Sequence, residues 1–459
     1  MRPLKFYPVL TVFFLLVFFS PSKIFYFSSF LILAGFLSYK LKNTVKGLTY
    51  ALIVSLFLDV GIGYSYFKME PDLGSLYAVK PATMLALGLV PLAILKTKMK
   101  FQKTDIAAVA FFIWLAISFF YLPYSNIFYG IIQIFEALLI YLLLRANLES
   151  DDIKNIKLLM IATIFFQLSV AYLQFILKRN AGFISEGSTY SNPFGLATYE
   201  NENLFRVSGT FDHPNIFAAI IVSLFPFLAL LKPNFWLLLF FGLPLFFSYS
   251  RLAWAAWGIL LVIIYFRKMI KFRLKFPDKR KILYLLPVFP FIYLLFPYFI
   301  SRSESLLNLF TPKSSLDIRL KMYSEGLNII GKYPFTGVGL NNSLVYYASY
   351  PVTTLFSLVE VGFSYRLHNM FLEIAAETGL IGLGLFLLIL VTVYFEFKKI
   401  SRKKKQVGGK LNELINFKKT ALLSLIFLLI ISFFNPFFHN LPFQLLLLYI
   451  SFIMVSPSS

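Results

Sequence analysis

The sequence contains no cysteine and only three histidines, and charged residues make up 14% of its 459 positions. The absence of cysteine excludes disulfides, cysteine-attached haem and thiolate metal sites. The scarcity of charge excludes an ordinary soluble globular protein, in which about a quarter of the residues are charged. What the chain has in abundance is apolar: 59% of its residues are hydrophobic and its mean hydropathy is +0.76. This composition indicates a polytopic membrane protein.

Apolar runs recur along almost the whole chain. A hydrocarbon layer about 30 Å thick needs about 20 apolar residues per helix. The first run has the basic start of a signal peptide but no small-x-small cleavage site, so it is kept as a span. We place spans near 6–20, 24–39, 48–66, 78–95, 104–122, 127–144, 156–177, 212–231, 234–250, 252–266, 282–300, 370–396, 420–435 and 440–456. The sequence thus predicts an all-α polytopic integral membrane protein of about 12–14 transmembrane helices, in a single membrane domain over 1–459.

The net charge of +22 follows the predicted topology. Basic clusters at 40–46, 96–103, 145–157, 267–281 and 398–419 all fall on one side of the membrane, and roughly 30 of the lysines and arginines lie there. This is the positive-inside pattern, so the N-terminus is expected in the cytoplasm and anionic lipid headgroups are the expected surface partner. A nucleic-acid partner is not expected.

Two connections on the opposite, outer face are long, at 178–211 and 301–369. Long connections in compact folds are usually functional. The first leads into "RVSGTFDHPNIFAAI", where Gly209, Pro214 and Asn215 are typical of a turn and a helix start. Arg206, Asp212 and His213 add polar chemistry at that point.

A single arginine interrupts about 30 apolar residues in "FFSYSRLAWAAWGIL". An arginine in the middle of a span costs a few kcal/mol, so we expect the chain to turn there and to place Arg251 at the outer boundary. The alternative role is an interfacial anchor beside Trp254 and Trp257.

The large outer connection contains an amphipathic pattern. Helical spacing of apolar residues over 316–330, with Ser315 as a cap and Gly331 as the stop, predicts a helix on or near the membrane. Arg319 and Lys321 lie on its more polar sides, where the alternative is a solvated face.

The stretch "RLHNMFLEIAAETGL" opens a long apolar run. Residues 370–397 would make about 42 Å of helix at about 1.5 Å per residue, which is two turns more than the hydrocarbon needs. The surplus is expected at the N-terminal end, which would raise His368, Glu373 and Glu377 to the headgroup layer. The helix dipole favours the two carboxylates there and disfavours a charged imidazole, so His368 is expected to be neutral.

These stretches together resemble the superfamily of O-antigen ligases, Wzy-type O-antigen polymerases and pilin-type O-oligosaccharyltransferases. Over 204–395, in the order that such proteins show, "GTFDHPNIFAA" is similar to the family's GTF-x-x-PN run and "SYSRLAW" to its SRxAW run. "IRLKMYSEGLNIIGKYPFTGVGLNN" is similar to its R-x-x-x-W…P-x-x-GVG-x-N segment, and "HNMFLEIAAETGLIG" to its HN-x-x-L…E-x-G-x-x-G signature. Tyr323 stands near the place that tryptophan usually holds.

The resemblance implies a GT-C-like fold in the bacterial inner (cytoplasmic) membrane, with a large, partly helical outer loop and an active site facing the periplasm. The implied activity is inverting glycosyl transfer from a polyprenyl (undecaprenyl) diphosphate-linked glycan to an acceptor hydroxyl, on a lipid A-core or on another glycan, without a metal or other cofactor. Arg251 and Arg319 would bind the diphosphate, because a guanidinium stays charged and binds phosphate oxygens bidentately. His368 would be the general base.

The resemblance places further substrate-binding residues at Arg206, His213, Asn215, Asn341 and Glu377. Glu377 has two candidate roles: orienting the acceptor or supporting the start of its helix. Ligase and polymerase share these motifs, so the acceptor stays open.

Two other classes of function compete with this one. A transporter or flippase of polysaccharide or lipid-linked glycan could use Asp59 and Glu136, which lie within apolar spans. A metal-dependent glycosyltransferase could use Glu70 and Asp72 as an outer carboxylate pair. The acidic run at 149–152 faces the cytoplasm and is typical of a helix cap.

Overall fold

The structure is a computed structural model of the full chain. It describes residues 7–58, 60–64, 77–96, 101–121, 125–183, 206–211, 213–231, 235–271, 315–343, 345–346, 350, 352, 366–402, 409–439 and 441–455.

The described residues form a helical membrane protein, as predicted. Its helices are α1 (Tyr7–Phe18), α2 (Lys23–Leu41), α3 (Thr44–Ser55), α4 (Pro81–Lys96), α5 (Lys103–Tyr121), α6 (Ser125–Asn147), α7 (Ile153–Leu177), α8 (Pro214–Ala229), α9 (Phe235–Phe247), α10 (Arg251–Lys271), α13 (Ser315–Lys332), α15 (Met370–Arg402), α16 (Gly409–Ser432) and α17 (Leu441–Ile453), with the short 3-10 helix η2 (Ser150–Asp152) before α7. Five described helical segments are long and apolar enough to cross a membrane, and seven shorter ones are apolar. The predicted span at 282–300 lies outside the described residues.

One predicted span is wrong in its second half. The run at 48–66 was expected to be one helix, but α3 ends at Ser55 and the chain then forms β1 (Ile62–Tyr64), which pairs antiparallel with β2 (Tyr77–Val79). Gly61 and Gly63 explain the difference, because glycine is a poor helix former. The acidic run at 149–152 is a cap as predicted, since the Asp152 carboxylate accepts the Glu149 amide at 2.8 Å.

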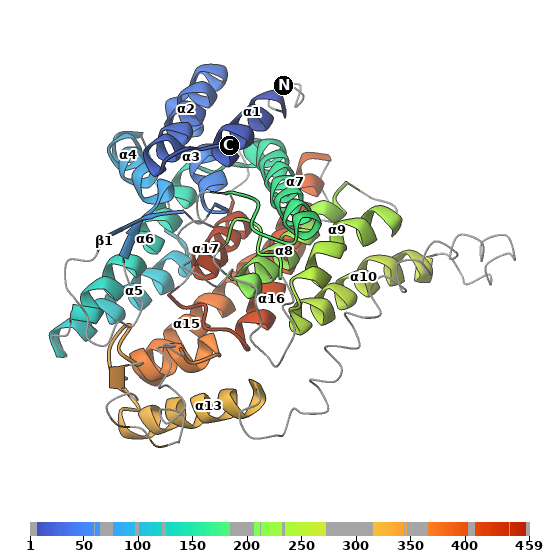
Figure 1. Ribbon diagram of the computed structural model, residues 1–459. Coiled ribbons are helices and arrows are strands. Elements are labelled where there is room, and N and C mark those ends of the chain that lie inside the picture. Colours follow the sequence, from blue (N-terminus) through green and yellow to red (C-terminus); the bar gives the residue numbers. More distant parts are fainter. Residues whose placement is uncertain are drawn as a thin grey trace, which may run out of the picture.

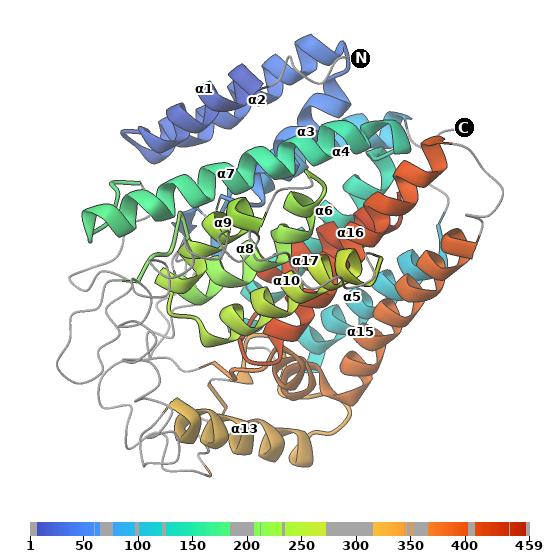
Figure 2. The ribbon, with the colours of Figure 1, turned by 90° about the vertical axis from the view of Figure 1, so that its right-hand side faces the viewer.

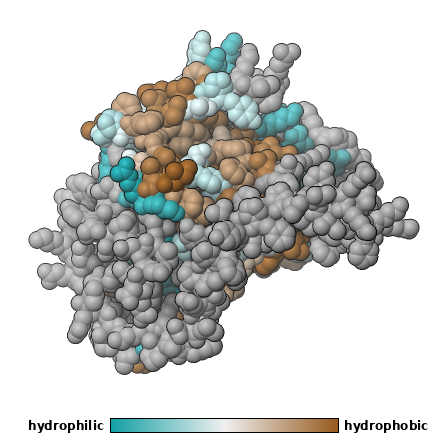
Figure 3. Space-filling model, turned by 45° about the vertical axis from the view of Figure 1, so that its right-hand side comes forward, coloured by the Kyte–Doolittle hydropathy of each residue, from teal (hydrophilic) through white to brown (hydrophobic). Residues whose placement is uncertain are grey.

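The outer surface of the helices is apolar, which is the arrangement expected in lipid. Ile106 and Ile113 on α5 are 61% and 56% exposed, and Leu387, Leu388 and Val391 on α15 are also exposed. Figure 3 shows apolar side chains gathered over the described helices on one face. A water-soluble protein rarely exposes contiguous apolar surface on this scale.

The centre of the bundle is formed by helices that are apolar all round. Every residue of α17 is buried, and α8 is buried from Phe217 to Leu228. Helix α16 packs against both of them, and α5 packs along α15. Helices α1 and α2 lie on one side of the molecule, while α13 crosses the opposite side beside the start of α15 (Figures 1 and 2).

Helix α13 forms where the sequence predicts it. The side that packs against the protein, however, is formed by other residues than the predicted apolar stripe. Met322 and Ile329 are buried in a small core with Val338. Leu320 and Leu327, which belong to the stripe predicted to face the membrane, are 53% and 61% exposed. The helix is therefore apolar on two sides, because it packs on the protein with one and presents the other outward.

Helix α15 is broken near its start, where the length of the apolar run predicted two surplus turns. Gly379 has φ 71° and ψ 178°, so the residues from Met370 to Thr378 are set off from the rest of the helix. The break is held by the connection after α13: the Leu380 amide donates to the Pro334 carbonyl at 2.7 Å and the Gly339 amide to the Glu377 carbonyl at 2.9 Å. The surplus turns thus pack against protein, and both Glu373 and Glu377 are fully buried.

We expect Gly379→Ala to destabilise the protein by about 3 kcal/mol or more, because only glycine populates this backbone region readily. An added Cβ would also lie 2.0 Å from the Phe335 carbonyl oxygen. Thermal unfolding of the purified protein measures the effect. Gly384→Ala is the matched control on the same helix, because nothing lies within 4 Å of its added Cβ, and it should unfold no earlier than the wild type. Equal unfolding temperatures for both variants would contradict this account of the break.

Candidate functional site

The segment that leads into α8 is tied to the turn between α9 and α10. The Arg206 guanidinium donates through Nε to the Ser248 carbonyl at 2.8 Å and through Nη2 to Asn215 Oδ1 at 3.1 Å. The next amide, that of Val207, donates to the Phe247 carbonyl at 3.1 Å. The first and second motifs of the resemblance are therefore one structural unit.

Two buried glutamines of α7 hold the loop between Arg206 and His213. Gln174 Oε1 accepts the amides of Ser208 and Gly209 at 3.0 and 2.9 Å. Gln167 Oε1 accepts the Thr210 amide at 3.1 Å, and its Nε2 donates to Thr210 Oγ1 at 2.7 Å. These bonds satisfy backbone groups that would otherwise be buried without partners. Sequence reasoning passed over both glutamines as parts of a span.

His213 caps α8, as the turn and helix-start residues around it predict. Its ring Nδ1 accepts the Asn215 amide at 3.0 Å, and Pro214 occupies the first turn. Burial, with a contribution from the charge of Arg206, lowers the pKa of His213 to about 4. The imidazole is therefore neutral near pH 7, and because Nδ1 is the acceptor, Nε2 carries the proton.

The chain turns immediately before Arg251, as predicted. Helix α9 ends at Phe247, Tyr249 has φ 53°, and α10 begins at Arg251. Trp254 fixes the turn by donating from Nε1 to the Leu245 carbonyl at 2.8 Å. Since consecutive Cα atoms are about 3.8 Å apart, the Cα of Arg251 lies within about 11 Å of that of Ser248, to which Arg206 is bound.

His368 lies where three elements meet, just before α15. The Tyr323 hydroxyl of α13 donates to the His368 carbonyl at 3.1 Å, and the backbone of Phe434 after α16 lies near the ring. Burial first, then the charges of Arg319 and His213, lower the pKa of His368 to about 3. The sequence predicted a neutral imidazole, and the environment makes it one. It also makes the ring a weaker base than the near-neutral one expected.

The two ring nitrogens of His368 are not equivalent. Nδ1 is buried and has no hydrogen-bond partner in the part of the chain that the structure describes. Nε2 is not among the buried atoms without a partner. A buried polar atom without a partner is rare in proteins, so Nδ1 is the atom of the ring that calls for a function.

Glu377 is the centre of a buried polar network at the break of α15. Its Oε2 accepts the Asn341 amide at 2.8 Å and contacts His439 Nε2 at 2.5 Å, and its Oε1 accepts the Ser343 hydroxyl at 2.8 Å. Both oxygens are thus engaged within the protein. Of the two roles predicted for Glu377, these contacts favour support of the helix start over contact with the acceptor.

Arg366 extends the network towards the site. Its Nη2 donates to Asn341 Oδ1 at 2.7 Å, and its Nη1 lies 3.4 Å from Glu373 Oε1. Asn341 itself has φ 58°, and its Nδ2 has no hydrogen-bond partner among the described residues. That amide is therefore a buried donor that the described residues leave unsatisfied.

One group of side chains within the described ranges has the composition of a metal site: Glu373, Glu377 and His439 each offer a ligand atom, and these atoms lie within 4.8 Å of one another. The ligand atoms are engaged with protein groups in this structure: His439 Nε2 contacts Glu377 Oε2 directly at 2.5 Å, and Arg366 Nη1 lies 3.4 Å from Glu373 Oε1. His439 was missed by sequence reasoning. Its only signal was that it is one of three histidines in the chain.

The structure brings the predicted residues into two linked groups. Arg206, His213, Asn215, Arg319 and His368 form one through hydrogen bonds and mutual electrostatic effects, and Asn341 and Glu377 belong to the network beside it. Asp59, Glu70, Asp72 and Asp212 lie outside the described residues. Glu136, considered for transport, accepts the Thr83 hydroxyl at 2.5 Å between α6 and α4.

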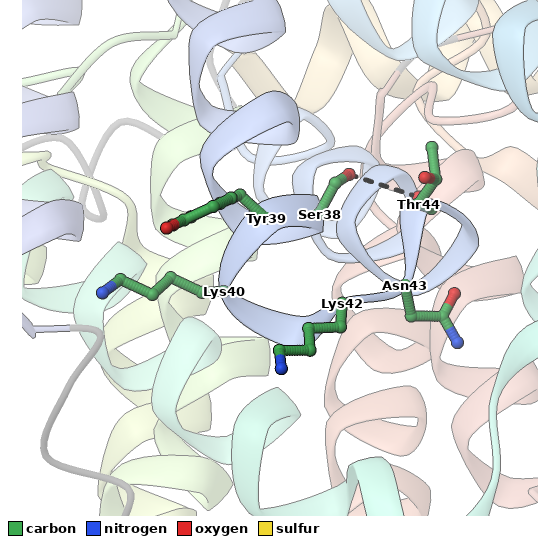
Figure 4. Close-up of a pocket in the computed structure, with 6 residues that line it drawn as sticks. All are labelled: Ser38, Tyr39, Lys40, Lys42, Asn43 and Thr44. Carbon is green, nitrogen blue, oxygen red and sulfur yellow. Dashed lines mark hydrogen bonds between the residues drawn. The ribbon is translucent and has the colours of Figure 1, made fainter.

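A hollow of about 530 Å³ lies elsewhere, at the turn between α2 and α3. Figure 4 shows its lining, Ser38, Tyr39, Lys40, Lys42, Asn43 and Thr44. None of the predicted site residues contributes to it. Lys40 and Lys42 belong to a basic cluster that the sequence assigns to the cytoplasmic surface.

Comparison with known proteins identifies the region that contains Arg251, Arg319 and His368. No curated protein matches the chain. Residues 233–387, about a third of the chain, match the family model described as O-antigen ligase. That region runs from α9 through the break in α15 and leaves out Arg206, His213 and His439. Over residues 233–387, the chain is therefore similar to the O-antigen ligase family, which supports the O-antigen ligase/polymerase superfamily that its motifs resemble.

Proposed function

We propose that this protein transfers a glycan from a polyprenyl-diphosphate carrier to an acceptor hydroxyl at the outer face of the membrane. The similarity of residues 233–387 to the O-antigen ligase family supports a membrane enzyme of glycosyltransferase-like, ligase or polymerase type, with a lipid-linked glycan donor and a glycan acceptor. The observation that carries the finer proposal is the place of His368: Tyr323 of α13 donates to its carbonyl at 3.1 Å, and Arg319 and His213 are near enough for their charges to lower the pKa of its ring. An imidazole nitrogen without a partner among the described residues, near a guanidinium group, suits proton removal next to an anionic leaving group.

The arginines supply the stabilisation that the leaving group needs. As the anomeric C–O bond breaks, negative charge accumulates on the lipid diphosphate, and preorganised guanidinium groups bind it without a metal or other cofactor. We assign Arg251 and Arg319 to the diphosphate. Arg206 and Asn215 hold the surrounding backbone, and His213 presents its Nε2 proton as a neutral donor.

His368 is the proposed general base. In the proposed reaction its Nδ1 takes the proton of the acceptor hydroxyl while that oxygen attacks the anomeric carbon and the diphosphate leaves from the opposite side. A direct displacement of this kind inverts the anomeric configuration. The pKa of about 3 belongs to the protein without its donor. A bound diphosphate would offset the charge of Arg319 and raise that pKa, so the base would gain strength when the donor is in place.

The pH dependence of the reaction tests this tuning. Because the pKa of His368 is lowered to about 3, the base is already neutral in the free enzyme, and kcat/KM should stay flat from pH 8 down to pH 5. A histidine with a pKa of about 6.5 would instead lose about 30-fold over that range. The kcat profile, which reports the complex, should show its acidic limb at higher pH than kcat/KM. An acidic limb near pH 6.5 in kcat/KM that persists in His213→Gln would contradict the account.

Complementation separates the two members of the superfamily. The gene is expressed in a strain that lacks its O-antigen ligase and in one that lacks its polymerase, and glycan chain lengths are compared on gels. A ladder restored in one strain identifies the acceptor class, lipid A-core or growing glycan. The His368→Ala variant is the control in both strains. Restoration that does not need His368, or flux of lipid-linked glycan across liposomes that depends on Glu136, would overturn the proposal in favour of transport.

A further inference from the structure

The connection between α16 and α17, residues 433–439, lies outside the family match at 233–387, yet it contacts the proposed base and the helix that follows it. The backbone of Phe434 lies near the His368 ring. Phe433 stacks on Phe371 of α15 with ring centroids 4.3 Å apart. His439 closes the far end of the connection, where its side chain is 1% exposed and contacts Glu377 at 2.5 Å.

These contacts fix the first part of α15, before the break at Gly379, near both of its ends. His368 precedes the first turn, and Glu377 stands just before the break at Gly379. Between them the helix makes about two turns, which behave as a rigid rod of about 12 Å. A connection that is fixed at Glu377 and at Phe371 therefore also fixes where the Phe434 backbone lies beside the imidazole.

The charges of the network explain why a histidine is needed at 439. Two buried carboxylates, Glu373 and Glu377, face one guanidinium, that of Arg366, and the imidazole of His439. A buried carboxylate is tolerated only with a matching charge or several donated hydrogen bonds. The Glu377 carboxylate contacts three groups: the Asn341 amide and the Ser343 hydroxyl, both from the loop after α13, and His439 Nε2. His439 thus adds the one partner of Glu377 that comes from the α16–α17 connection.

We propose that His439 is a positioning residue for the base: by holding Glu377, it locks the α16–α17 connection to the start of α15, so that this connection keeps its place beside the His368 ring and holds the ring in its orientation towards the acceptor. The inference rests on the proposed function, because it assigns His439 a part in the reaction attributed to His368. It adds a third element to a site whose family match ends at residue 387.

The test compares His439→Ala with His439→Gln in the full-length purified protein, using a lipid-linked glycan donor. A misplaced base costs on the order of 10²-fold in rate, so His439→Ala should lower kcat by about that factor. Its KM for the donor should change less than about 3-fold, because the proposed diphosphate ligands lie on α10 and α13. Glutamine can place an amide NH₂ where His439 Nε2 stands and should restore most of kcat.

A double variant shows whether His439 acts through Glu377. If it does, Glu377→Gln combined with His439→Ala should be no slower than the slower single variant, since coupled residues are not additive. Ser223→Ala is the matched control, because it also removes a buried polar contact, the 2.9 Å hydrogen bond between Ser223 of α8 and Tyr449 of α17. It should leave kcat unchanged.

Three results would overturn the inference. The first is a wild-type kcat in His439→Ala. The second is an equal loss in His439→Ala and His439→Gln with a lowered unfolding temperature in both, which would make His439 a stability residue only. The third is a divalent metal that raises kcat of the wild type and not of His439→Gln, which would make the cluster a metal site. His368→Ala, assayed beside them, separates the two proposals: if it keeps full activity the proposed function fails, whatever His439 does.

Discussion

Replacing His368 by alanine is expected to lower the rate of glycan transfer by about 10²–10⁴-fold, the usual contribution of a positioned acid or base. The reason is that the imidazole Nδ1 is a buried nitrogen with no hydrogen-bond partner among the described residues, while Tyr323 holds the His368 carbonyl and the charge of Arg319 acts on the ring. Binding of the lipid-linked donor should persist, because the proposed diphosphate ligands lie on other elements. Single-turnover transfer with bound donor measures the chemical step directly.

The control for this variant is the amount and integrity of the protein. Yield, elution in detergent and unfolding temperature should match the wild type, since alanine keeps the backbone carbonyl that Tyr323 bonds and the ring forms no ion pair with the residues that the structure describes. Full transfer activity in His368→Ala would remove the base assignment. Loss of donor binding together with activity would instead make His368 a binding residue.

Lysine in place of Arg251 or Arg319 is expected to cost about 10²–10³-fold in kcat, comparable to the loss of one well-placed donor to a developing anion. Lysine preserves the charge but not the planar fork that binds two phosphate oxygens. The same enzyme assay, with donor concentration varied, gives kcat and KM for each variant. Arg319→Lys should in addition leave the pKa of His368 low, because a positive charge remains beside the ring.

Lys321→Arg is the matched control on the same helix. Lys321 pairs with Asp317 at 2.9 Å across one helical turn, and both side chains are partly exposed. Such a pair contributes little, so its replacement should change kcat less than about 2-fold. Equal losses of kcat for Arg319→Lys and Lys321→Arg would show that α13 tolerates no exchange of one basic residue for another. The assignment of Arg319 to the diphosphate would then be wrong.

The sequence predicted the parts of this site that depend on local pattern. Apolar runs predicted the helices, and the lone arginine predicted the turn before Arg251. His213, Pro214 and Asn215 predicted the start of α8. Each is decided within a few residues by hydropathy, capping or the cost of a charge in lipid. The excess length of the run after His368 also located the surplus turns, which end at Gly379.

The sequence did not reveal the long-range contacts that assemble the site. Glu377 meets Asn341 and His439, which are 36 and 62 positions away, and Gln174 meets Gly209 at 35. Each residue alone has an ordinary local explanation, and nothing in the spacing of one helix indicates which side chain of another will face it. Glu377 illustrates this: the sequence left open whether it orients the acceptor or supports the start of its helix, and its contacts with Asn341, Ser343 and His439 favour the second role.

The most direct test of the central claim is reconstitution of the purified protein in liposomes with undecaprenyl-diphosphate-linked glycan and a lipid A-core or glycan acceptor, in the presence of EDTA. Lipid diphosphate released and glycan transferred are measured together. The account predicts equal amounts of both, inverted configuration at the new bond, and none of either with His368→Ala. Transfer that requires an added divalent metal, or glycan moved across the membrane with its lipid diphosphate still attached, would contradict it.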